Sequence, residues 1–427
     1  MEKISEKNVA RLWKSGRLSR FRDDMGNEVE VICAGRESTR PGCDFQDVVI
    51  SVNREKLVGD VELHLSSDLW QKHGHHTNPA YNGIILHVAM WQRGLLPVKL
   101  EMGKAVPTVI LSGYITERTL QKQREEGHLC HCRYACVVKS STGLKKILLQ
   151  AGIQRFSTKS AKYAAVLQDS DAAQALYKGI CRALGYSRNT AQFEMLADRL
   201  PLNSIMGSKA GSLIKKQAMI IGCAGLLPSQ GRVAGSVLSS EQIAEIEREW
   251  LALSEKPSPF PALRWNLSFL RPGNHPLKRL IYLSHLLHKY EAGGLVRGFN
   301  DLLETAAPGS ESACLENGLL INDGHPLIGR NRAREIAVNQ ILPFLLANAV
   351  SEGDLSLATR VINTYLNYGA MADNELLRYM KQQLCIKESK DLNACAQQGL
   401  LHIYHSFCRV KECLCCPVFT RRRPNRE

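Results

Sequence analysis

The chain has 427 residues, of which 44% are hydrophobic and 22% charged, and these values are typical of folded globular proteins rather than disordered chains. Because this length exceeds one ordinary hydrophobic core, we expect two or three domains. The formal net charge of +14 favours an anionic partner, and nucleic acid is the commonest partner of a basic protein, although a solvated basic surface would give the same value.

The N-terminal residues are polar, and the longest apolar stretch, residues 218–228, is too short to cross a bilayer. These features predict a cytoplasmic protein without a membrane span. The 14 cysteines are then expected to be thiols or metal ligands rather than disulfides.

The first part of the chain shows the pattern of an α+β domain. Apolar residues recur first at helical spacing and then in runs of β-branched residues bounded by turn residues. We therefore expect a mixed sheet with flanking helices over residues 1–160. The expected helix covers residues 9–18, and the expected strands cover residues 29–34, 45–52, 58–65, 83–91 and 106–115.

From residue 161 onward the apolar periodicity is that of helices, so a large all-α domain is predicted over residues 161–427. A proline-rich break is a candidate sub-boundary at 254–262. The expected helices cover residues 172–184, 192–200, 211–224, 241–253, 277–290, 298–305, 332–349, 355–367, 374–384 and 394–407.

Two segments place acidic and histidine side chains on neighbouring predicted strands. Asp44 opens one strand, while Glu62 and His64 lie two residues apart on the next and therefore share a face. If the hairpin turn is centred on Arg54, Asp44 lies directly across from His64 and diagonal to Glu62. Asp44 and Glu62 would then hold one Mg²⁺ or Mn²⁺ ion. A slip of one residue in the register would abolish this site.

These residues resemble the PD-(D/E)XK phosphodiesterase superfamily, in which an Asp opens the second strand of a meander and an acid-x-Lys triplet lies on the third. Asp44 and Glu62 match the acidic positions, and His64 stands in place of the Lys. The resemblance implies a restriction-endonuclease-like fold and a metal-dependent phosphodiester hydrolase acting on nucleic acid, with Asp44, Glu62 and His64 as its catalytic residues.

Other readings stay open because His, unlike Lys, is not a fixed cation near neutral pH. The protein could be a catalytically inactive nucleic-acid-binding protein or a helical scaffold for protein partners. The acids could also lie on a solvated sheet face without any metal.

Further polar side chains follow shortly after Glu62 and could supply metal ligands, acid–base groups or phosphate contacts. A polar loop whose histidines bind backbone groups is the alternative. The accessory candidates are His73, His75, His76, Lys72, Tyr81 and His87.

The C-terminal region is rich in cysteine. Cys408, Cys413 and Cys416, with Cys395 or Cys415 as a fourth thiolate, would suit a structural zinc ion or an iron–sulfur cluster. Buried reduced cysteines are the alternative. A second group lies near the junction of the predicted domains and comprises His128, Cys130, His131, Cys132 and Cys136.

Motifs in both halves resemble a bacterial family, of about this length, built on a domain of unknown function. This resemblance implies a shared fold and leaves the function to the chemistry of the residues. The motifs are residues 41–45, 59–64, 86–88, 183–186, 200–202, 271–276 and 397–400, together with Trp70, His73 and His75.

Overall fold

The computed structural model describes residues 5–14, 19–38, 42–115, 141–186, 188–207, 211–230, 238–253, 265–267, 272–323, 325–386 and 392–418. The candidate sub-boundary at 254–262 and the group His128, Cys130, His131, Cys132 and Cys136 lie outside these residues. The chain forms two compact units. The sheet unit comprises Met1–Ile147, Asp373–Ser389 and Leu400–Glu427, and the helical unit comprises Leu148–Ala372 and Lys390–Gly399.

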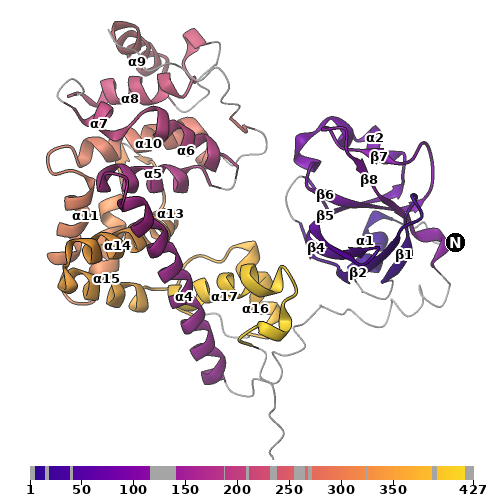
Figure 1. Cartoon of the computed structure of the whole chain (residues 1–427). Helices are drawn as coiled ribbons and strands as arrows, with labels where there is room; N and C mark the ends of the chain where they lie inside the picture. Colours follow the sequence, from indigo (N-terminus) through magenta and orange to yellow (C-terminus); the bar gives the residue numbers. More distant parts are fainter. Residues whose placement is uncertain are drawn as a thin grey trace, which may run out of the picture. The chain divides into compact units, whose positions relative to one another are not determined.

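The sheet unit is built on a mixed sheet, as expected (Figure 1). Along the sheet the strands follow the order β1-β2-β4-β5-β6-β9, and β3 pairs with β4. Pairing is antiparallel from β1 to β5 and parallel from β5 through β6 to β9. The strands are β1 (Arg20–Arg22), β2 (Glu28–Cys33), β3 (Arg36–Glu37), β4 (Phe45–Val52), β5 (Glu55–Ser66), β6 (Ile84–Trp91) and β9 (Thr108–Ile110).

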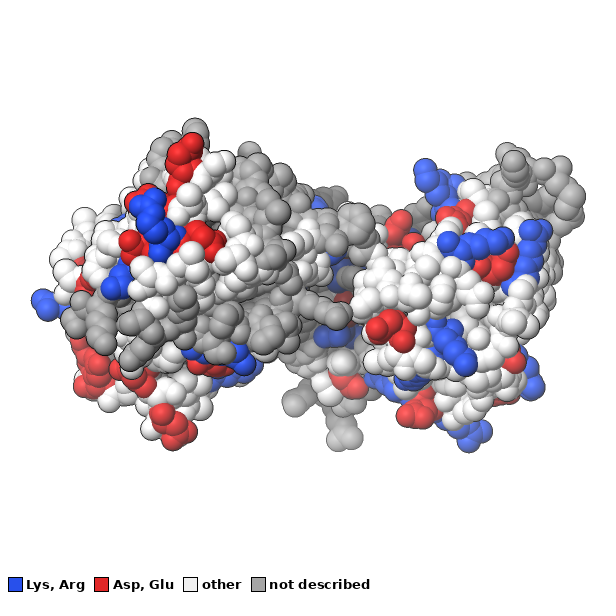
Figure 2. All heavy atoms as spheres, turned by 90° about the horizontal axis from the view of Figure 1, so that it is seen from above, with Lys and Arg blue, Asp and Glu red and all other residues white. Residues whose placement is uncertain are grey.

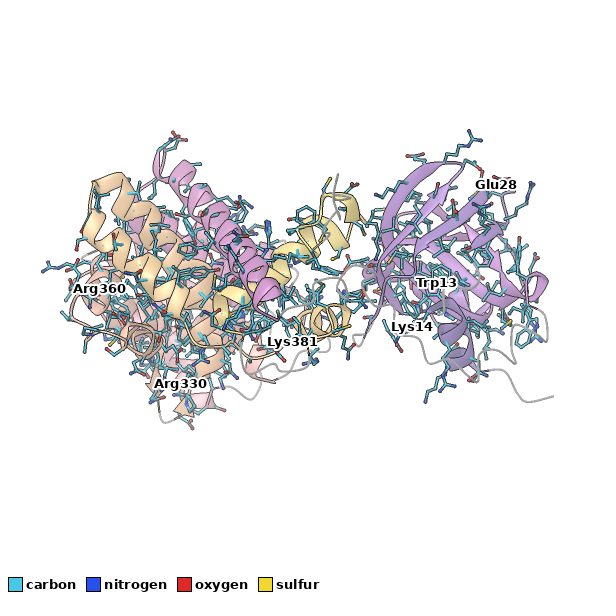
Figure 3. The ribbon with its side chains drawn as sticks, turned by 90° about the horizontal axis from the view of Figure 1, so that it is seen from below. Trp13, Lys14, Glu28, Arg330, Arg360 and Lys381 are labelled. Atoms are coloured by element: carbon cyan, nitrogen blue, oxygen red, sulfur yellow. The ribbon has the colours of Figure 1, made fainter. Side chains whose placement is uncertain are left out.

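Different elements cover the two faces of this sheet. Helix α1 (Glu6–Lys14) buries Val9, Leu12 and Trp13 against one face, where Trp13 also donates a hydrogen bond to the Ala34 carbonyl at 2.9 Å (Figure 3). A smaller apolar cluster around Trp70 forms on the opposite face. The elements near it are α2 (Leu69–Lys72), η1 (His75–Thr77), η2 (Pro79–Tyr81) and the hairpin of β7 (Val98–Lys99) and β8 (Ala105–Val106).

The register of β4 against β5 differs from the expected one. The hairpin closes with a two-residue turn at Asn53 and Arg54, both at positive φ (49° and 74°), so the turn centre lies half a residue before Arg54. A β-bulge at Asp47, with φ of 55°, then adds one residue to β4. The prediction that Asp44 faces His64 is therefore wrong. The position of the turn and the extra residue of the bulge together place Asp44 beside Glu62. Asp44 therefore lies on the same face of the sheet as Glu62.

The helical unit packs its helices around one large apolar core. Helix α4 starts at Ser141, well before the predicted start of the helical region, because apolar residues on several of its sides hide the helical period. The helices that contribute to the unit are α4 (Ser141–Leu167), α5 (Ala172–Leu184), α6 (Thr190–Arg199), α7 (Leu202–Met206), α8 (Leu213–Cys223), α9 (Ser240–Ala252), α10 (Pro276–Lys289), α11 (Leu295–Glu304), α12 (Glu311–Leu319), α13 (Arg330–Ile336), α14 (Leu342–Glu352), α15 (Leu355–Asn367) and the first part of α17 (Ala394–Ile403).

Two glycines allow α4 and α17 to cross at very short range. A Cβ atom on Gly399 would lie 1.9 Å from the Leu148 carbonyl oxygen, and one on Gly152 would lie 2.0 Å from the Cys395 carbonyl oxygen. Only residues without a side chain can occupy these positions, since the obstacles are backbone atoms.

The last part of the chain returns to the sheet unit and contacts the bulge of β4. Tyr404 and Arg409 both bind the Asp47 carboxylate, the latter at 2.7 Å. Arg36 binds Asp47 at 3.1 Å and also Glu375 of α16 (Glu375–Gln383) at 2.8 Å. The Asp47 carboxylate in the bulge is therefore bound by Arg36, which precedes it in the sequence, and by Tyr404 and Arg409, which follow it much later.

No helix in the described parts of the chain is long and apolar enough to cross a membrane. Basic and acidic side chains are interspersed on the face seen in Figure 2. Most of the excess positive charge belongs to residues outside the described ranges, such as those at 421–423.

Candidate metal centre

Three neighbouring strands direct polar side chains to the sheet face opposite α1. Glu62 and His64 lie two residues apart on β5, and Glu62 pairs with His87 of β6, which in turn pairs with Thr108 of β9. Each of these four residues is at most 5% exposed. The alternation of β5 explains the arrangement, because Val61 and Leu63 point into the apolar core on the other face.

The loop after α2 adds two more imidazoles. His73 and His75 are separated by Gly74, whose φ of 72° lets the chain turn so that both rings approach His64. Their ring centroids lie 5.1 Å and 5.2 Å from that of His64. Ligand atoms of the three histidines lie within 4.8 Å of one another.

Three donor atoms converge at metal-ligand spacing. The Nε2 atoms of His64 and His75 are 3.3 Å apart, and Oε1 of Glu62 lies 3.3 Å from His75 Nε2 and 3.8 Å from His64 Nε2. Donors about 2.0–2.1 Å from a tetrahedral metal ion are separated from one another by roughly 3.3–3.4 Å. Glu62, His64 and His75 therefore fit one face of such a coordination shell, and a ligand atom of His73 lies within 4.8 Å of those of His64 and His75.

Asp44 lies at the edge of this group. Its backbone N–H donates to Glu62 Oε2 at 3.1 Å, and its own Oδ2 accepts from the Leu63 N–H at 2.9 Å. These bonds fix the two carboxylates next to each other on adjacent strands. The second carboxylate that the sequence placed in the site is thus present beside Glu62.

Burial sets the protonation states of the group. Burial, with a further contribution from Asp44, raises the pKa of Glu62 to about 9. Burial and the neighbouring histidines lower the pKa of His64 to about 2, and burial lowers the pKa of His75. Without a metal, Glu62 is therefore protonated and both imidazoles are neutral near pH 7. A divalent ion would favour ionised Glu62 and bind the lone pairs of both imidazoles.

A hydrogen-bonded chain behind His64 sets its orientation. His64 Nδ1 lies 3.0 Å from His87 Nε2, and His87 Nδ1 lies 3.3 Å from Thr108 Oγ1. If His64 binds a metal through Nε2, its Nδ1–H donates to His87, and the Nδ1–H of His87 donates to Thr108. Such second contacts fix the tautomer and raise the basicity of a ligating histidine.

The remaining accessory candidates lie around this group. The Tyr81 ring is 3.9 Å from the His75 ring, and burial, with Glu62 and Asp44, raises the pKa of Tyr81 to about 12. His76 is exposed on η1. Lys72 is exposed and pairs with Asp68 at 2.6 Å, so it does not take the place of the superfamily's lysine in this conformation.

The C-terminal cysteines do not gather into a group of possible metal ligands in the described part of the chain. Cys395 belongs to the helical unit, is buried, and its thiol contacts the Leu149 carbonyl at 3.6 Å. Cys408, Cys413 and Cys416 belong to the sheet unit.

Sequence reasoning missed two residues of the site. Thr108 supports His87 from β9, and the charge of Glu6, on α1, raises the pKa of both Asp44 and Glu62. Neither residue carries a local motif. Thr108 could be found only from the pairing of β6 with β9, which the amino-acid pattern does not specify.

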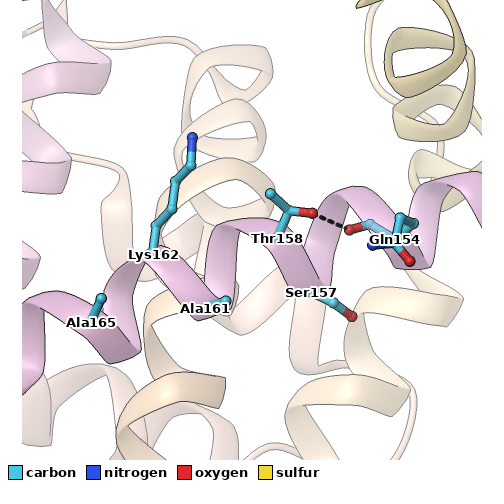
Figure 4. Close-up of a pocket in the computed structure, with 6 residues that line it drawn as sticks. All are labelled: Gln154, Ser157, Thr158, Ala161, Lys162 and Ala165. Carbon is cyan, nitrogen blue, oxygen red and sulfur yellow. Dashed lines mark hydrogen bonds between the residues drawn. The ribbon is translucent and has the colours of Figure 1, made fainter. Parts of the chain in front are cut away.

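A groove along α4 is lined by fewer side chains that could bind a metal or take part in a reaction. It has a volume of about 520 Å³, and Lys162 supplies its single charged side chain (Figure 4). The Thr158 hydroxyl in its wall donates to the Gln154 carbonyl of the preceding turn at 2.8 Å. The other lining residues are Ser157, Ala161 and Ala165.

Comparison with known proteins gives one match. No curated protein and no solved structure matches the chain significantly. A family model described as "Protein of unknown function (DUF2851)" matches residues 6–309, which include the whole group of Asp44, Glu62 and the histidines. The chain therefore belongs to this family.

Proposed function

We propose that the protein is a metal-dependent phosphodiester hydrolase that acts on nucleic acid. The observation that carries the proposal is the convergence of Glu62 Oε1, His64 Nε2 and His75 Nε2 at 3.3–3.8 Å beside a second carboxylate, Asp44. A site of this kind would supply a metal ion that polarises a phosphoryl oxygen and acidifies a bound water.

The order of elements also supports the proposal. Helix α1, the antiparallel strands β2, β4 and β5, then α2 and the parallel strand β6 follow the order expected for the PD-(D/E)XK core. Asp44 precedes the second of these strands and Glu62 lies on the third, as in that superfamily.

The donor set changes the expected metal. Two imidazole nitrogens with one carboxylate oxygen suit Mn²⁺ or Zn²⁺ better than Mg²⁺, which prefers oxygen ligands. Glu62, His64 and His75 would hold the ion, with His73 completing the set. His64 would thus act as a ligand, a role different from that of the superfamily's lysine.

Asp44 is the best-placed group to accept a proton from the attacking water. Burial raises its pKa from the usual range, and this makes it a stronger base than a solvated carboxylate. Attack of water on phosphorus would break the bond to the leaving oxygen, which would take its proton from solvent, since His73 serves here as a ligand.

Metal titration of the full-length protein tests the proposal first. The protein is stripped with a chelator and titrated calorimetrically with Mn²⁺, Zn²⁺ and Mg²⁺, and the metal-loaded form is then incubated with DNA and RNA. We expect one tight site for Mn²⁺ or Zn²⁺ and metal-dependent cleavage. Both should be lost in Glu62→Gln, because the substitution removes an ionisable ligand without changing the size of the side chain.

Glu30→Gln is the matched control, since Glu30 is an exposed acid on β2 of the same sheet. Cleavage that persists in Glu62→Gln would contradict the proposal. A wild-type protein that binds metal and nucleic acid but cleaves neither DNA nor RNA would favour the catalytically inactive alternative. If the wild-type protein bound no metal, neither the hydrolase proposal nor the inactive metal-binding alternative would have support.

A further inference from the structure

Two buried arginines in the helical unit share a single carboxylate. Arg279, in the first turn of α10, is 5% exposed, and the side chain of Arg332, on α13, is 10% exposed. Glu335 pairs with Arg332 at 2.6 Å and is the carboxylate whose charge acts on Arg279. Within the described ranges, the two guanidinium groups therefore leave one positive charge uncompensated in a desolvated place, which is costly without an anion.

Several N–H groups of these arginines have no acceptor among the residues that the structure describes. Arg279 donates through Nη2 to Asn274 Oδ1 at 2.9 Å, while its Nε and Nη1 atoms have no partner. Arg332 binds Glu335 and the Ala183 carbonyl, and its Nε is also without a partner. Since Nε carries one hydrogen and Nη1 carries two, about four N–H bonds lack an acceptor at these two side chains.

Tyr186 covers both arginines in an unusual backbone conformation. Its ring centroid lies 3.5 Å from the Arg332 guanidinium carbon and 5.9 Å from that of Arg279. Its φ is 58°, a value that bulky residues rarely adopt and that is frequent at ligand sites. Because Tyr186 is 43% exposed as a residue, its side chain has room to move outward and uncover the guanidinium groups.

We propose that Arg279 and Arg332 form a binding site for a phosphate group, closed by Tyr186. Guanidinium groups bind phosphate oxygens in pairs of parallel hydrogen bonds, and the unpartnered N–H bonds supply such donors from two directions. The site also lies at the positive N-terminal end of α10, a 14-residue helix. The inference is independent of the metal centre, which belongs to the other unit.

The phosphate could belong to a small molecule or to the terminal or internal phosphates of a nucleic acid. The donor atoms are buried beneath the Tyr186 ring, so there is little room around a phosphate bound to them. This favours a terminal phosphate, because an internal phosphodiester is linked to a nucleotide on each side and needs more room. Free phosphate and two oligonucleotides distinguish these sources: one oligonucleotide carries a 5′-phosphate and the other, of the same sequence, a 5′-hydroxyl.

Calorimetry and thermal unfolding of the full-length protein at constant ionic strength test the site. We expect saturable binding of inorganic phosphate and a phosphate-dependent rise in Tm. Arg279→Lys and Arg332→Gln should each weaken binding roughly 10- to 100-fold, because each removes charge-assisted hydrogen bonds. Arg279→Lys keeps the buried charge and most of the stem, so it tests the site even if Arg332→Gln fails to fold.

Arg297→Gln is the matched control, since Arg297 is an exposed arginine on α11. Binding of free phosphate and of the 5′-phosphorylated oligonucleotide, without the 5′-hydroxyl one, would assign a terminal phosphate. Equal binding of both oligonucleotides that falls in Arg279→Lys would assign backbone phosphates. Wild-type protein that does not respond to phosphate, or an equal response in Arg279→Lys and the control, would overturn the proposal.

Discussion

At the scale of single residues, the burial of Glu62 links the metal centre to stability. Without a metal the pKa of Glu62 in the folded protein is about 9, compared with 4.5 for an exposed glutamate. Between these values the unfolded chain loses the proton and the folded protein keeps it. The free energy of unfolding therefore falls as pH rises through this window.

Glu62→Gln removes this dependence because an amide does not titrate. In the presence of a chelator, we expect the variant and the wild type to have similar Tm at pH 4.5, and the variant to be several degrees more stable at pH 9. Thermal unfolding at a series of pH values measures the difference. Glu30→Gln should show no such trend, and a pH-independent difference for Glu62→Gln would mean that Glu62 is not buried in its protonated form.

The sequence identified most residues of the site but not how they meet. Asp44, Glu62, His64, His73 and His75 could be chosen because acids and histidines are dense in one segment. Asp44 was placed across from His64, however, because the number of residues in the turn and the bulge at Asp47 are backbone properties that the apolar pattern does not reveal.

At the scale of elements, the strands were predicted better than the longest helix. Strand β4 has the bounds expected from its alternation, because one of its faces is packed on α1. The start of α4 was missed, since its apolar residues do not gather on one side and so do not give the amphipathic period that sequence analysis detects.

The crossing of α4 and α17 gives a test of this packing. Ala is normally favoured over Gly within a helix by about 1 kcal/mol, yet Gly399→Ala should destabilise the protein by about 1–3 kcal/mol, because the new methyl group would meet the Leu148 carbonyl. Chemical denaturation measures the change. Gly369→Ala, where a Cβ meets nothing within 4 Å, is the control, and equal effects at the two sites would argue against the close crossing.

At the scale of the whole molecule, the change from strands to helices along the chain was visible in the sequence, whereas the path of the C-terminal part was not. After more than 200 residues in the helical unit, the chain rejoins the sheet unit at Asp373–Ser389 and again from Leu400 onward. Contacts of this segment include those of the single polar side chains Tyr404 and Arg409 with Asp47, and no periodic pattern in the sequence predicts such pairs.

Removing both contacts should loosen the sheet locally. In Tyr404→Phe combined with Arg409→Gln, we expect faster amide hydrogen exchange in β4 and β5, because Asp47 stabilises the bulge between them. Amides of the helical unit serve as the internal control and should exchange at the wild-type rate. Unchanged exchange in β4 would show that Arg36 alone is sufficient to hold Asp47.

The separation of 357 residues between Asp47 and Tyr404 also has a consequence during protein synthesis. A ribosome adding about 5–20 residues per second takes roughly 20–70 s to cover this distance. Throughout this interval the nascent sheet carries Asp47 without Tyr404 and Arg409, while the helices made in between can already assemble. The side-chain contacts that hold the bulge between Asp44 and Glu62 can therefore form only after the intervening helices have been synthesised.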